Sequence, residues 1–292
     1  MLSVRSLTSQ PTSFVGGLQL RGEFPKASVV FFVATRWEMA AIRRALPPDR
    51  EENVCGLRCL IGHKADWSYR LIQTGVGPER ARMAATAVLQ GKEISLAISS
   101  GFAGALVPAG IGDVIIGTGT MSAVYDGDWR QDAGVEATHG KSVEWARELA
   151  AQIGASTHVG LVVSMSTVVG HSVDKFAIRR LTGAVALDME SASLAAVAQE
   201  RRIPFFVLRT VSDLVDEDLP LDFNAFLGPT AWSKGLYELI THPTGLFRLN
   251  RLRRHSKLAA DRLTELCSLY AERGVAPMNW ANRDGGLKDR DD

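Results

Sequence analysis

Apolar runs and helix-like segments alternate along the middle of the chain. Residues 28–34 (SVVFFVA) are almost continuously apolar, which is typical of a strand buried on both faces of a sheet. Residues 37–46 then carry apolar side chains at helical spacing and end at Pro47-Pro48, where a helix stops. This alternation continues to residue 210 and predicts an α/β fold: a mixed, mostly parallel sheet with helices on both faces.

The other elements are predicted from similar segments. Further strands are expected at residues 57–62, 69–74, 94–99, 113–118, 158–164, 185–187 and 205–210. Further helices are expected at residues 79–89, 144–153 and 190–200. The sequence contains no repeat of fixed period, so the pattern does not indicate a repeat architecture.

Composition divides the chain into four parts. Residues 1–27 contain several serines and threonines with no acid before Glu23, and we predict a disordered leader, with a targeting peptide as the alternative. Residues 28–227 form the predicted α/β domain. Residues 228–278 form a predicted helical extension, and the polar residues 279–292 form a predicted disordered tail.

The helical extension combines leucines with basic residues. In residues 246–257 one helical face carries Leu246, Leu249 and Leu252, and the basic residues are Arg248, Arg251, Arg253, Arg254 and Lys257. A second helix is expected at residues 258–270. A basic amphipathic helix either packs on the core with its arginines in solvent or lies on an anionic membrane surface, and both interpretations stay open.

Charge and composition exclude several classes of protein. The 292 residues include 33 lysines and arginines against 32 aspartates and glutamates, and this net charge of +1 argues against nucleic acid as a partner. Hydrophobic residues make up 46% of the chain, yet no apolar run approaches the ~18 residues that span a bilayer. The cysteines Cys55, Cys59 and Cys267 are too few for a disulfide scaffold and form no zinc motif, so a reduced, cytoplasmic protein without a metal is expected.

Three acids follow the ends of predicted strands. Glu38 comes shortly after residues 28–34, Glu190 after residues 185–187 and Asp213 after residues 205–210. Because ligands of open α/β sheets bind beyond the carboxyl ends of the strands, these acids are expected to meet at one rim. Each could instead cap the next helix, but three converging acids beside glycine-rich segments favour a functional site.

Three common types of site do not fit the sequence. Gly75-Val-Gly77 begins like a dinucleotide-binding fingerprint, but Arg80 stands where the third glycine belongs. The six histidines include no H-x3-H pair for zinc. A serine hydrolase would need a G-x-S-x-G elbow, which the chain lacks.

Several segments carry a family resemblance in the order in which they occur. They are Thr74–Gly77 (TGVG), Ser100–Leu106 (SGFAGAL) with Gly112–Val114 (GDV), Leu187–Ser191 (LDMES) and Pro204–Asp213 (PFFVLRTVSD). Over roughly residues 28–227 the chain resembles the purine nucleoside phosphorylase and methylthioadenosine/S-adenosylhomocysteine nucleosidase superfamily. The resemblance implies cleavage of a purine N-glycosidic bond, no metal or organic cofactor, and a homodimer or larger assembly.

The resemblance also implies roles for individual side chains. Asp213 would be the general acid that protonates the purine at N7, and Ser212 would orient it. Glu190 would accept hydrogen bonds from the ribose hydroxyls, with Met189 packing on the sugar. Glu38 would position the attacking water.

Five more positions are expected to contact the substrate. Val168 and Val169 fall where the family lines the base site, and the aromatic partner for the base is missing here. Phe102, Ala103 and Gly104, in a predicted loop after residues 94–99, are expected to line the site as well.

The same loop bears on the choice of nucleophile. Family phosphorylases hold phosphate there with an arginine and a serine or threonine, but this chain has Ser99 and Phe102 at those positions. Phosphate would need another donor such as Arg36, so water is favoured as the nucleophile. Phe102 also makes this region more apolar than in the nucleosidases.

The sequence therefore predicts an enzyme that releases adenine from a 5′-modified adenine nucleoside. The 5′ group could be thiomethyl, homocysteinyl or a hopanoid lipid, since residues 232–270 resemble the extension of the branch that handles adenosylhopane. A lipid-linked substrate would imply peripheral membrane contact through residues 246–257. Two alternatives stay open: a phosphate-dependent phosphorylase and a non-catalytic nucleoside-binding protein.

Overall fold

The computed structural model describes residues 27–64, 67–90, 94–219 and 245–274, with the backbone alone for residues 245–249. The strands are β1 Ala27–Val33, β2 Arg50–Val54, β3 Leu57–Lys64, β4 Trp67–Gln73, β5 Leu96–Ala105, β6 Val114–Tyr125, β7 Trp129–Gln131, β8 Glu136–Ala137, β9 Thr157–Met165, β10 Ala186–Asp188 and β11 Phe205–Asp213. The helices are α1 Arg36–Ala45, α2 Pro78–Val88, α3 Gly140–Gln152, α4 Ser172–Thr182, α5 Ser191–Glu200 and α7 Gly245–Arg273.

The described strands form one mixed sheet with the order β10-β9-β6-β11-β5-β1-β4-β3-β2, and β7 and β8 pair with β6. The two longest ladders, β6 with β9 and β11 with β5, are parallel. Strand β10 pairs with β5 as well as with β9, so β5, β11, β6, β9 and β10 close into a ring. The predicted mixed α/β fold is confirmed, and the closed end of the sheet holds the segments with the predicted acids.

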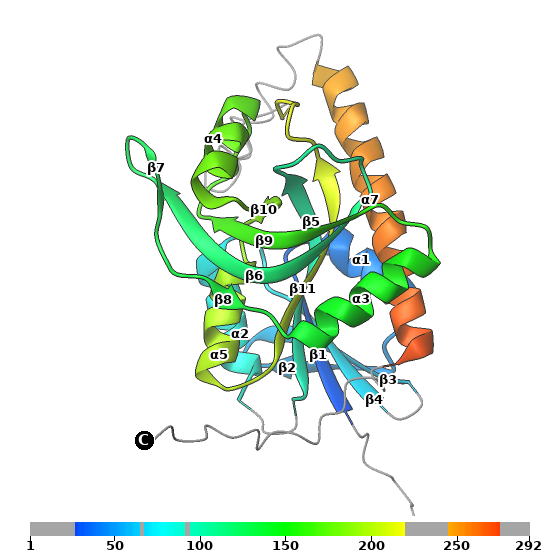
Figure 1. The fold of residues 1–292 in the computed structure, drawn as a ribbon. Helices are drawn as coiled ribbons and strands as arrows, with labels where there is room; N and C mark the ends of the chain where they lie inside the picture. Colours follow the sequence, from blue (N-terminus) through cyan, green and yellow to red (C-terminus); the bar gives the residue numbers. More distant parts are fainter. Residues whose placement is uncertain (1–26, 65–66, 91–93, 220–244, 275–292) are drawn as a thin grey trace, which may run out of the picture.

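Helices cover both faces of the sheet, as predicted (Figure 1). Helices α1, α3 and α7 pack on one face of β1, β4 and β5, and their apolar side chains form one buried cluster with those of the strands. Helices α2 and α5 pack in a second cluster on the other face. A third, smaller cluster lies between α4 and the strands β6 and β9. These clusters hold the carboxyl ends of the central strands in fixed positions.

The extension differs from its prediction in one respect. The two helices expected at residues 246–257 and 258–270 are a single helix, α7, because no glycine or proline interrupts residues 246–273 and each added residue extends a helix at little cost. The C-terminal half of α7 buries Leu263, Leu266 and Tyr270 in the first cluster. Its basic residues Arg253, Arg254 and Lys257 are exposed.

Other differences concern elements that local patterning did not reveal. Strand β2 (REENV) is mostly exposed and has no apolar alternation, and helix α4 and the short strands β7 and β8 were likewise not predicted. Residues 102–104 lie in β5 and not in a loop after residue 99, because β11 and β10 pair with this part of β5. The small residues of β5 resemble a loop only when their neighbours in the sheet are unknown.

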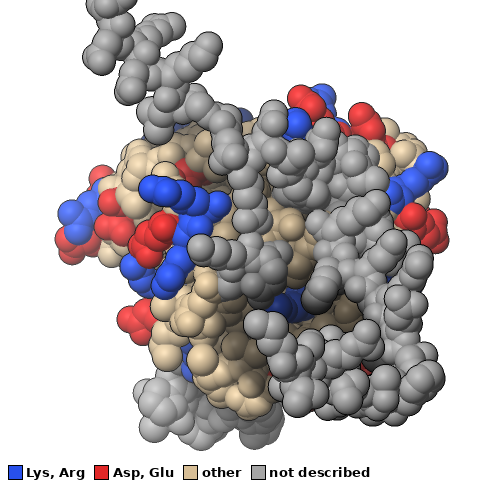
Figure 2. Space-filling view, turned by 90° about the horizontal axis from the view of Figure 1, so that it is seen from below, with Lys and Arg blue, Asp and Glu red and all other residues tan. Residues whose placement is uncertain are grey.

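The remaining predictions about the chain ends lie outside the described residues. These are the leader (apart from Ala27), residues 228–244 and 275–278 of the extension, and the tail 279–292. Among the residues described, no helix is both long enough and apolar enough to cross a membrane. On the described part of the face seen in Figure 2, basic and acidic side chains lie next to one another, in line with the small net charge.

Candidate active site

Three predicted acids lie around residues 101–104 of β5. A Cβ added at Gly101 would lie 2.2 Å from Oε1 of Glu38, and one added at Gly104 would lie 2.8 Å from Oδ1 of Asp213. Glu190 reaches the same region because its Oε2 is 3.4 Å from Nη2 of Arg209, the residue that pairs with Gly101 between β11 and β5. The structure therefore brings the three carboxylates together, and the two glycines leave the space that the carboxylates occupy.

Glu38 both caps helix α1 and faces the site. Its Oε2 accepts hydrogen bonds from the backbone N–H of Ala34 (3.0 Å) and of Thr35 (2.6 Å) and from the Thr35 hydroxyl (2.9 Å). The backbone N–H of Glu38 in turn donates to the Thr35 hydroxyl at 3.3 Å, which completes a capping box. Its Oε1 accepts one hydrogen bond, from the backbone N–H of Phe102 at 2.7 Å. Glu38 thus uses Oε2 to cap the helix, while Oε1 faces the site.

Arg209 lies at the centre of the acidic cluster and is buried. Its Nη1 donates to the Phe102 carbonyl and its Nη2 to the Ser99 hydroxyl, both at 2.9 Å. Its Nε lies 2.7 Å from Oδ2 of Asp188 and forms an ion pair with it. This contact is not a hydrogen bond, because the Nε–H does not point toward the oxygen. A buried guanidinium between two carboxylates offsets the cost of burying negative charge.

Asp188 holds the turn that carries Glu190. Its carboxylate accepts hydrogen bonds from the Ser164 hydroxyl at 2.5 Å, from the Ser191 hydroxyl, and from the backbone N–H groups of Glu190 and Ser191, both at 3.2 Å. This arrangement fixes the start of α5 with Glu190 at its N-cap. Asp188 is therefore a supporting residue for the neighbouring acid.

The pKa of the Glu190 carboxyl group is raised. Burial raises its pKa to about 7, with further upward contributions from Asp188 and Glu38, while Arg209 and a hydrogen bond from the Gly77 N–H oppose the rise. That N–H donates to Oε1 of Glu190 at 2.9 Å, so the glycine segment after β4 reaches the acid. Near neutral pH, the Glu190 carboxyl group can thus either accept or donate hydrogen bonds to hydroxyl groups.

Asp213 ends β11 and meets a cation that the sequence did not indicate. The ammonium of Lys175, which is buried on α4, donates to Oδ1 of Asp213 at 2.7 Å. The Ser212 hydroxyl lies 3.2 Å from Oδ2 of Asp213 and 3.4 Å from the Ala103 carbonyl. The side chain of Asp213 keeps 18% of its surface exposed, whereas Lys175 is fully buried.

The other predicted contact residues lie in varied environments. Met189, Val168 and Phe102 are half-buried, whereas Val169 is 3% exposed in the cluster beneath α4. Ala103 is buried to the same extent. The Arg36 side chain is exposed and lies over the Trp37 ring, 5.5 Å from its centroid, so the suggestion that it faces the site finds no support in its contacts. The described residues that line the space near Asp213 come from α4, from α7 and from the segment after β11.

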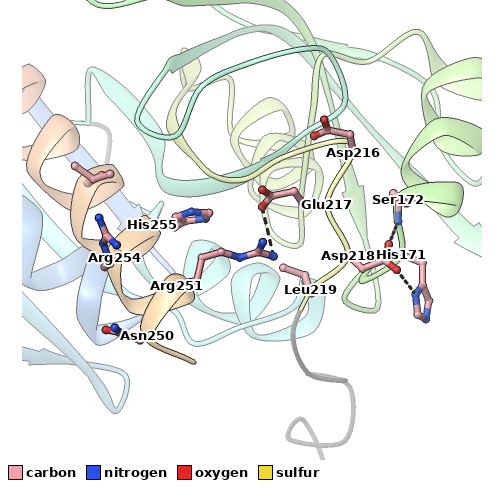
Figure 3. A pocket seen from close by; sticks show the side chains of 11 residues that line it. His171, Ser172, Asp216, Glu217, Asp218, Leu219, Asn250, Arg251, Arg254 and His255 are labelled. Atoms are coloured by element: carbon pink, nitrogen blue, oxygen red, sulfur yellow. Dashed lines mark hydrogen bonds and ion pairs between the residues drawn. The ribbon is translucent and has the colours of Figure 1, made fainter. Parts of the chain in front are cut away.

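A cavity of about 1140 Å³ lies beyond the end of β11 (Figure 3). Its described lining comes from the segment after β11, from the start of α4 and from α7, which contributes Arg251, Arg254 and His255. A small adjoining hollow shares part of this lining and reaches Ser212 and Asp213. Most of the described lining residues are polar or charged, and Glu217 and Arg251 form an ion pair at 3.6 Å. In the described part of the chain, no group of three side chains is suited to hold a metal ion.

Comparisons with known proteins show the family of the chain. The family model of the phosphorylase superfamily matches residues 28–231. The chain belongs to the phosphorylase superfamily. A 5′-methylthioadenosine/S-adenosylhomocysteine nucleosidase from Oceanobacillus iheyensis is 26% identical to this superfamily member over 200 residues, which cover 65% of this chain and 87% of that protein.

Solved structures of superfamily members share the fold. The 5′-methylthioadenosine/S-adenosylhomocysteine nucleosidase of Neisseria meningitidis in complex with methylthio-immucillin-A aligns with a TM-score of 0.62 and 23% identity, covering 82% of this chain and 98% of that one. The futalosine hydrolase of Helicobacter pylori aligns with a TM-score of 0.63 and 19% identity, covering 82% and 97%. The predicted superfamily and fold are confirmed.

Three charged residues around the predicted acids were not singled out from the sequence. Arg209 and Asp188 lie within the quoted segments, and an arginine inside the apolar run PFFVLRT had to be paired with buried acids, so this signal was available. Lys175 lies on α4, which was not predicted, and nothing in its local sequence indicates a partner 38 residues away.

Proposed function

We propose that this superfamily member is an N-ribosyl hydrolase that cleaves the C1′–N9 bond of a 5′-modified adenine nucleoside and releases adenine. The observation that carries the proposal is the convergence of Glu38, Glu190 and Asp213 on residues 101–104 of β5. The relative and one of the aligned structures named above are nucleosidases of methylthioadenosine and S-adenosylhomocysteine, and this supports the same reaction class.

Each acid has a distinct task in the proposed reaction. Asp213 gives a proton to N7, so that the purine leaves as a neutral base while the ribose develops positive charge at C1′. Glu190, held by the Gly77 N–H and near Arg209, contacts the ribose hydroxyls. Glu38 offers Oε1 to a water molecule, which loses a proton as it attacks C1′. The residues proposed to line the substrate are Met189, Val168, Val169, Phe102 and the β5 residues Ala103 and Gly104.

The polar contacts of the site favour water over phosphate as the nucleophile. The Arg209 guanidinium is already engaged by Asp188, Ser99 and the Phe102 carbonyl. Phe102 has no hydroxyl to offer, and a phosphate dianion in this region would meet the carboxylates of Glu38 and Glu190. A phosphate-dependent phosphorylase is the alternative, and a non-catalytic nucleoside-binding protein is an alternative from another class.

One assay separates these functions. Methylthioadenosine and S-adenosylhomocysteine are incubated with the protein with and without phosphate, and adenine and the sugar product are followed by chromatography. We expect adenine and the free sugar at a rate that phosphate does not change. A phosphate-dependent rate with a sugar 1-phosphate as product would establish a phosphorylase. Binding without adenine release would establish a non-catalytic nucleoside-binding protein. Near-normal turnover by Asp213→Asn would refute the assignment of the acid.

A lipid-linked nucleoside such as adenosylhopane is the second proposed substrate. Helix α7 supports it, because Arg251 and His255 line the cavity beyond Asp213 while Arg253 and Lys257 of the same helix are exposed to solvent. A basic helix beside the site could rest on an anionic membrane surface and receive a substrate from it. The protein would then be cytoplasmic and membrane-peripheral.

Flotation with phosphatidylglycerol vesicles tests this second proposal, combined with turnover of adenosylhopane in mixed micelles. We expect the double variant Arg253→Glu/Lys257→Glu to lose vesicle binding and lipid turnover while methylthioadenosine turnover is retained. Equal lipid turnover by wild type and variant would contradict the membrane role.

The protein is also proposed to assemble as a homo-oligomer. Val173 and Phe176, 71% and 51% exposed, present apolar surface on α4 next to the cavity residue Ser172. Light scattering with size-exclusion chromatography tests this, and we expect Phe176→Glu to shift the mass toward the monomer.

A further inference from the structure

Lys175 is a buried cation whose three protons are all used by the protein. Its side chain is 0% exposed, and its Nζ donates to Oδ1 of Asp213 at 2.7 Å, to the Leu214 carbonyl at 2.6 Å and to the Glu217 carbonyl at 3.3 Å. An ammonium in such a place is stable only if it is paired and fully hydrogen-bonded. Asp213 is the carboxylate that pairs with it.

These contacts leave one oxygen of Asp213 for a substrate. Oδ1 is held by Lys175, and Gly104 provides the gap in which the carboxylate lies, since a Cβ there would be 2.8 Å from Oδ1 and 3.2 Å from Oδ2. Within the described residues, Oδ2 has one hydrogen-bond partner, the Ser212 hydroxyl at 3.2 Å. The orientation of the proposed acid is thus set from α4, an element distant in sequence.

We propose that Lys175 is the positioning residue of Asp213: it orients the carboxyl group so that Oδ2 faces the purine, and its positive charge stabilises the carboxylate that forms when the proton is given up. This inference rests on the proposed function. In the step concerned, the proton passes from Oδ2 to N7, and the C1′–N9 electron pair goes to the departing purine. The water that attacks C1′ gives a proton to the Glu38 carboxylate; Glu38 then releases this proton to solvent, and Asp213 takes one up from solvent before the next turnover.

Lys175 could also serve only to fix the chain after β11, because it binds two carbonyls there. The two roles differ in their effect on the pH profile. If the charge acts on the acid, its removal makes protonation of Asp213 easier, and the basic limb of kcat/KM moves to higher pH. In the described part of the chain, the other charged or titratable groups that line the hollow next to Asp213 are Glu217, Asp218, Arg251 and His255.

The experiment compares Lys175→Met with wild type, using methylthioadenosine as substrate, with Lys141→Met on the exposed face of α3 as the control. We expect kcat to fall about 10- to 100-fold, with KM changing by less than about threefold, because the loss concerns proton transfer. The basic limb should move to higher pH. The control should match wild type. Thermal unfolding shows whether each variant is folded.

A double-mutant cycle with Asp213→Asn decides whether Lys175 acts through the acid. We expect Lys175→Met to cause no further loss of kcat in the Asp213→Asn background, whereas additive losses would overturn the proposal. An unchanged basic limb would also overturn it. If the methionine variant does not fold, Lys175→Gln replaces it in both measurements, since the amide keeps a donor for the carbonyls without the charge.

The outcomes separate this inference from the proposed function. Should the wild type cleave no nucleoside, the proposed function fails. Should Asp213→Asn be inactive while Lys175→Met keeps the wild-type rate and pH profile, only the role of Lys175 fails.

Discussion

Replacing Arg209 with methionine tests whether its guanidinium holds the acidic cluster together. Methionine fills much of the same volume but removes the positive charge and all hydrogen-bond donors. Asp188 would lose the ion pair at 2.7 Å and Glu190 the contact at 3.4 Å, and the Ser99 hydroxyl would lose a partner. Both carboxylates are at most 6% exposed and would remain buried without a cation.

The expected loss of stability is large because the charges left behind are buried. Breaking a buried ion pair by removing one partner costs about 3–5 kcal/mol. The cost should be greatest at high pH, since burial already raises the pKa of Glu190 to about 7 even with Arg209 beside it. At pH 5.5 the folded variant can protonate Glu190, and part of the loss is recovered.

Urea unfolding at pH 5.5 and pH 8 measures this. Arg82→Met is the control, because Arg82 and Glu200 form an ion pair at 3.3 Å with both side chains 58% exposed, worth less than about 1 kcal/mol. A loss for Arg209→Met as small as that of the control would refute the reasoning. So would a loss that does not depend on pH.

Three further predictions follow from individual contacts. Relative to Glu190→Gln, the free energy of unfolding of the wild type should fall by at most about 3 kcal/mol as pH rises from 4.5 to 7, and then level off. In that window the folded state holds a proton on Glu190 that the unfolded chain releases. Urea unfolding at a series of pH values measures this. Gly104→Ala should lower kcat about 100-fold in a folded protein, because the new Cβ would displace Asp213. Leu266→Ala on α7 should destabilise the protein by about 2–5 kcal/mol in urea unfolding, since Leu266 is fully buried.

Each of these three has a matched comparison. Wild-type stability that rises relative to Glu190→Gln between pH 4.5 and 7 would contradict the raised pKa. For Gly104→Ala the comparison is Gly140→Ala, where a Cβ meets nothing within 4 Å; equal activity of both variants would contradict the steric argument. For Leu266→Ala the comparison is Leu258→Ala on the same helix, 55% exposed, which should cost less than about 0.5 kcal/mol.

Local sequence patterns were sufficient for the main strands and for the superfamily. The run at residues 28–34 is apolar at nearly every position, because β1 lies inside the sheet with clusters on both faces. The superfamily was evident because its acids stand in short segments at the ends of strands, where a ligand can reach them. An exposed strand such as β2 carries no such signal, since its side chains do not have to alternate.

The pairing of buried charges was decided by tertiary structure. Sequence determined that Asp213 ends an apolar strand and that Arg209 lies within it. It did not determine that Lys175 forms an ion pair with Asp213. Nor did it determine that β10 pairs with β5, which helps to keep residues 102–104 within a strand. Periodicity reports whether one residue is buried relative to its neighbours in the chain. The partner of a buried charge depends on which distant elements the closed sheet brings within hydrogen-bond distance, and that requires the fold.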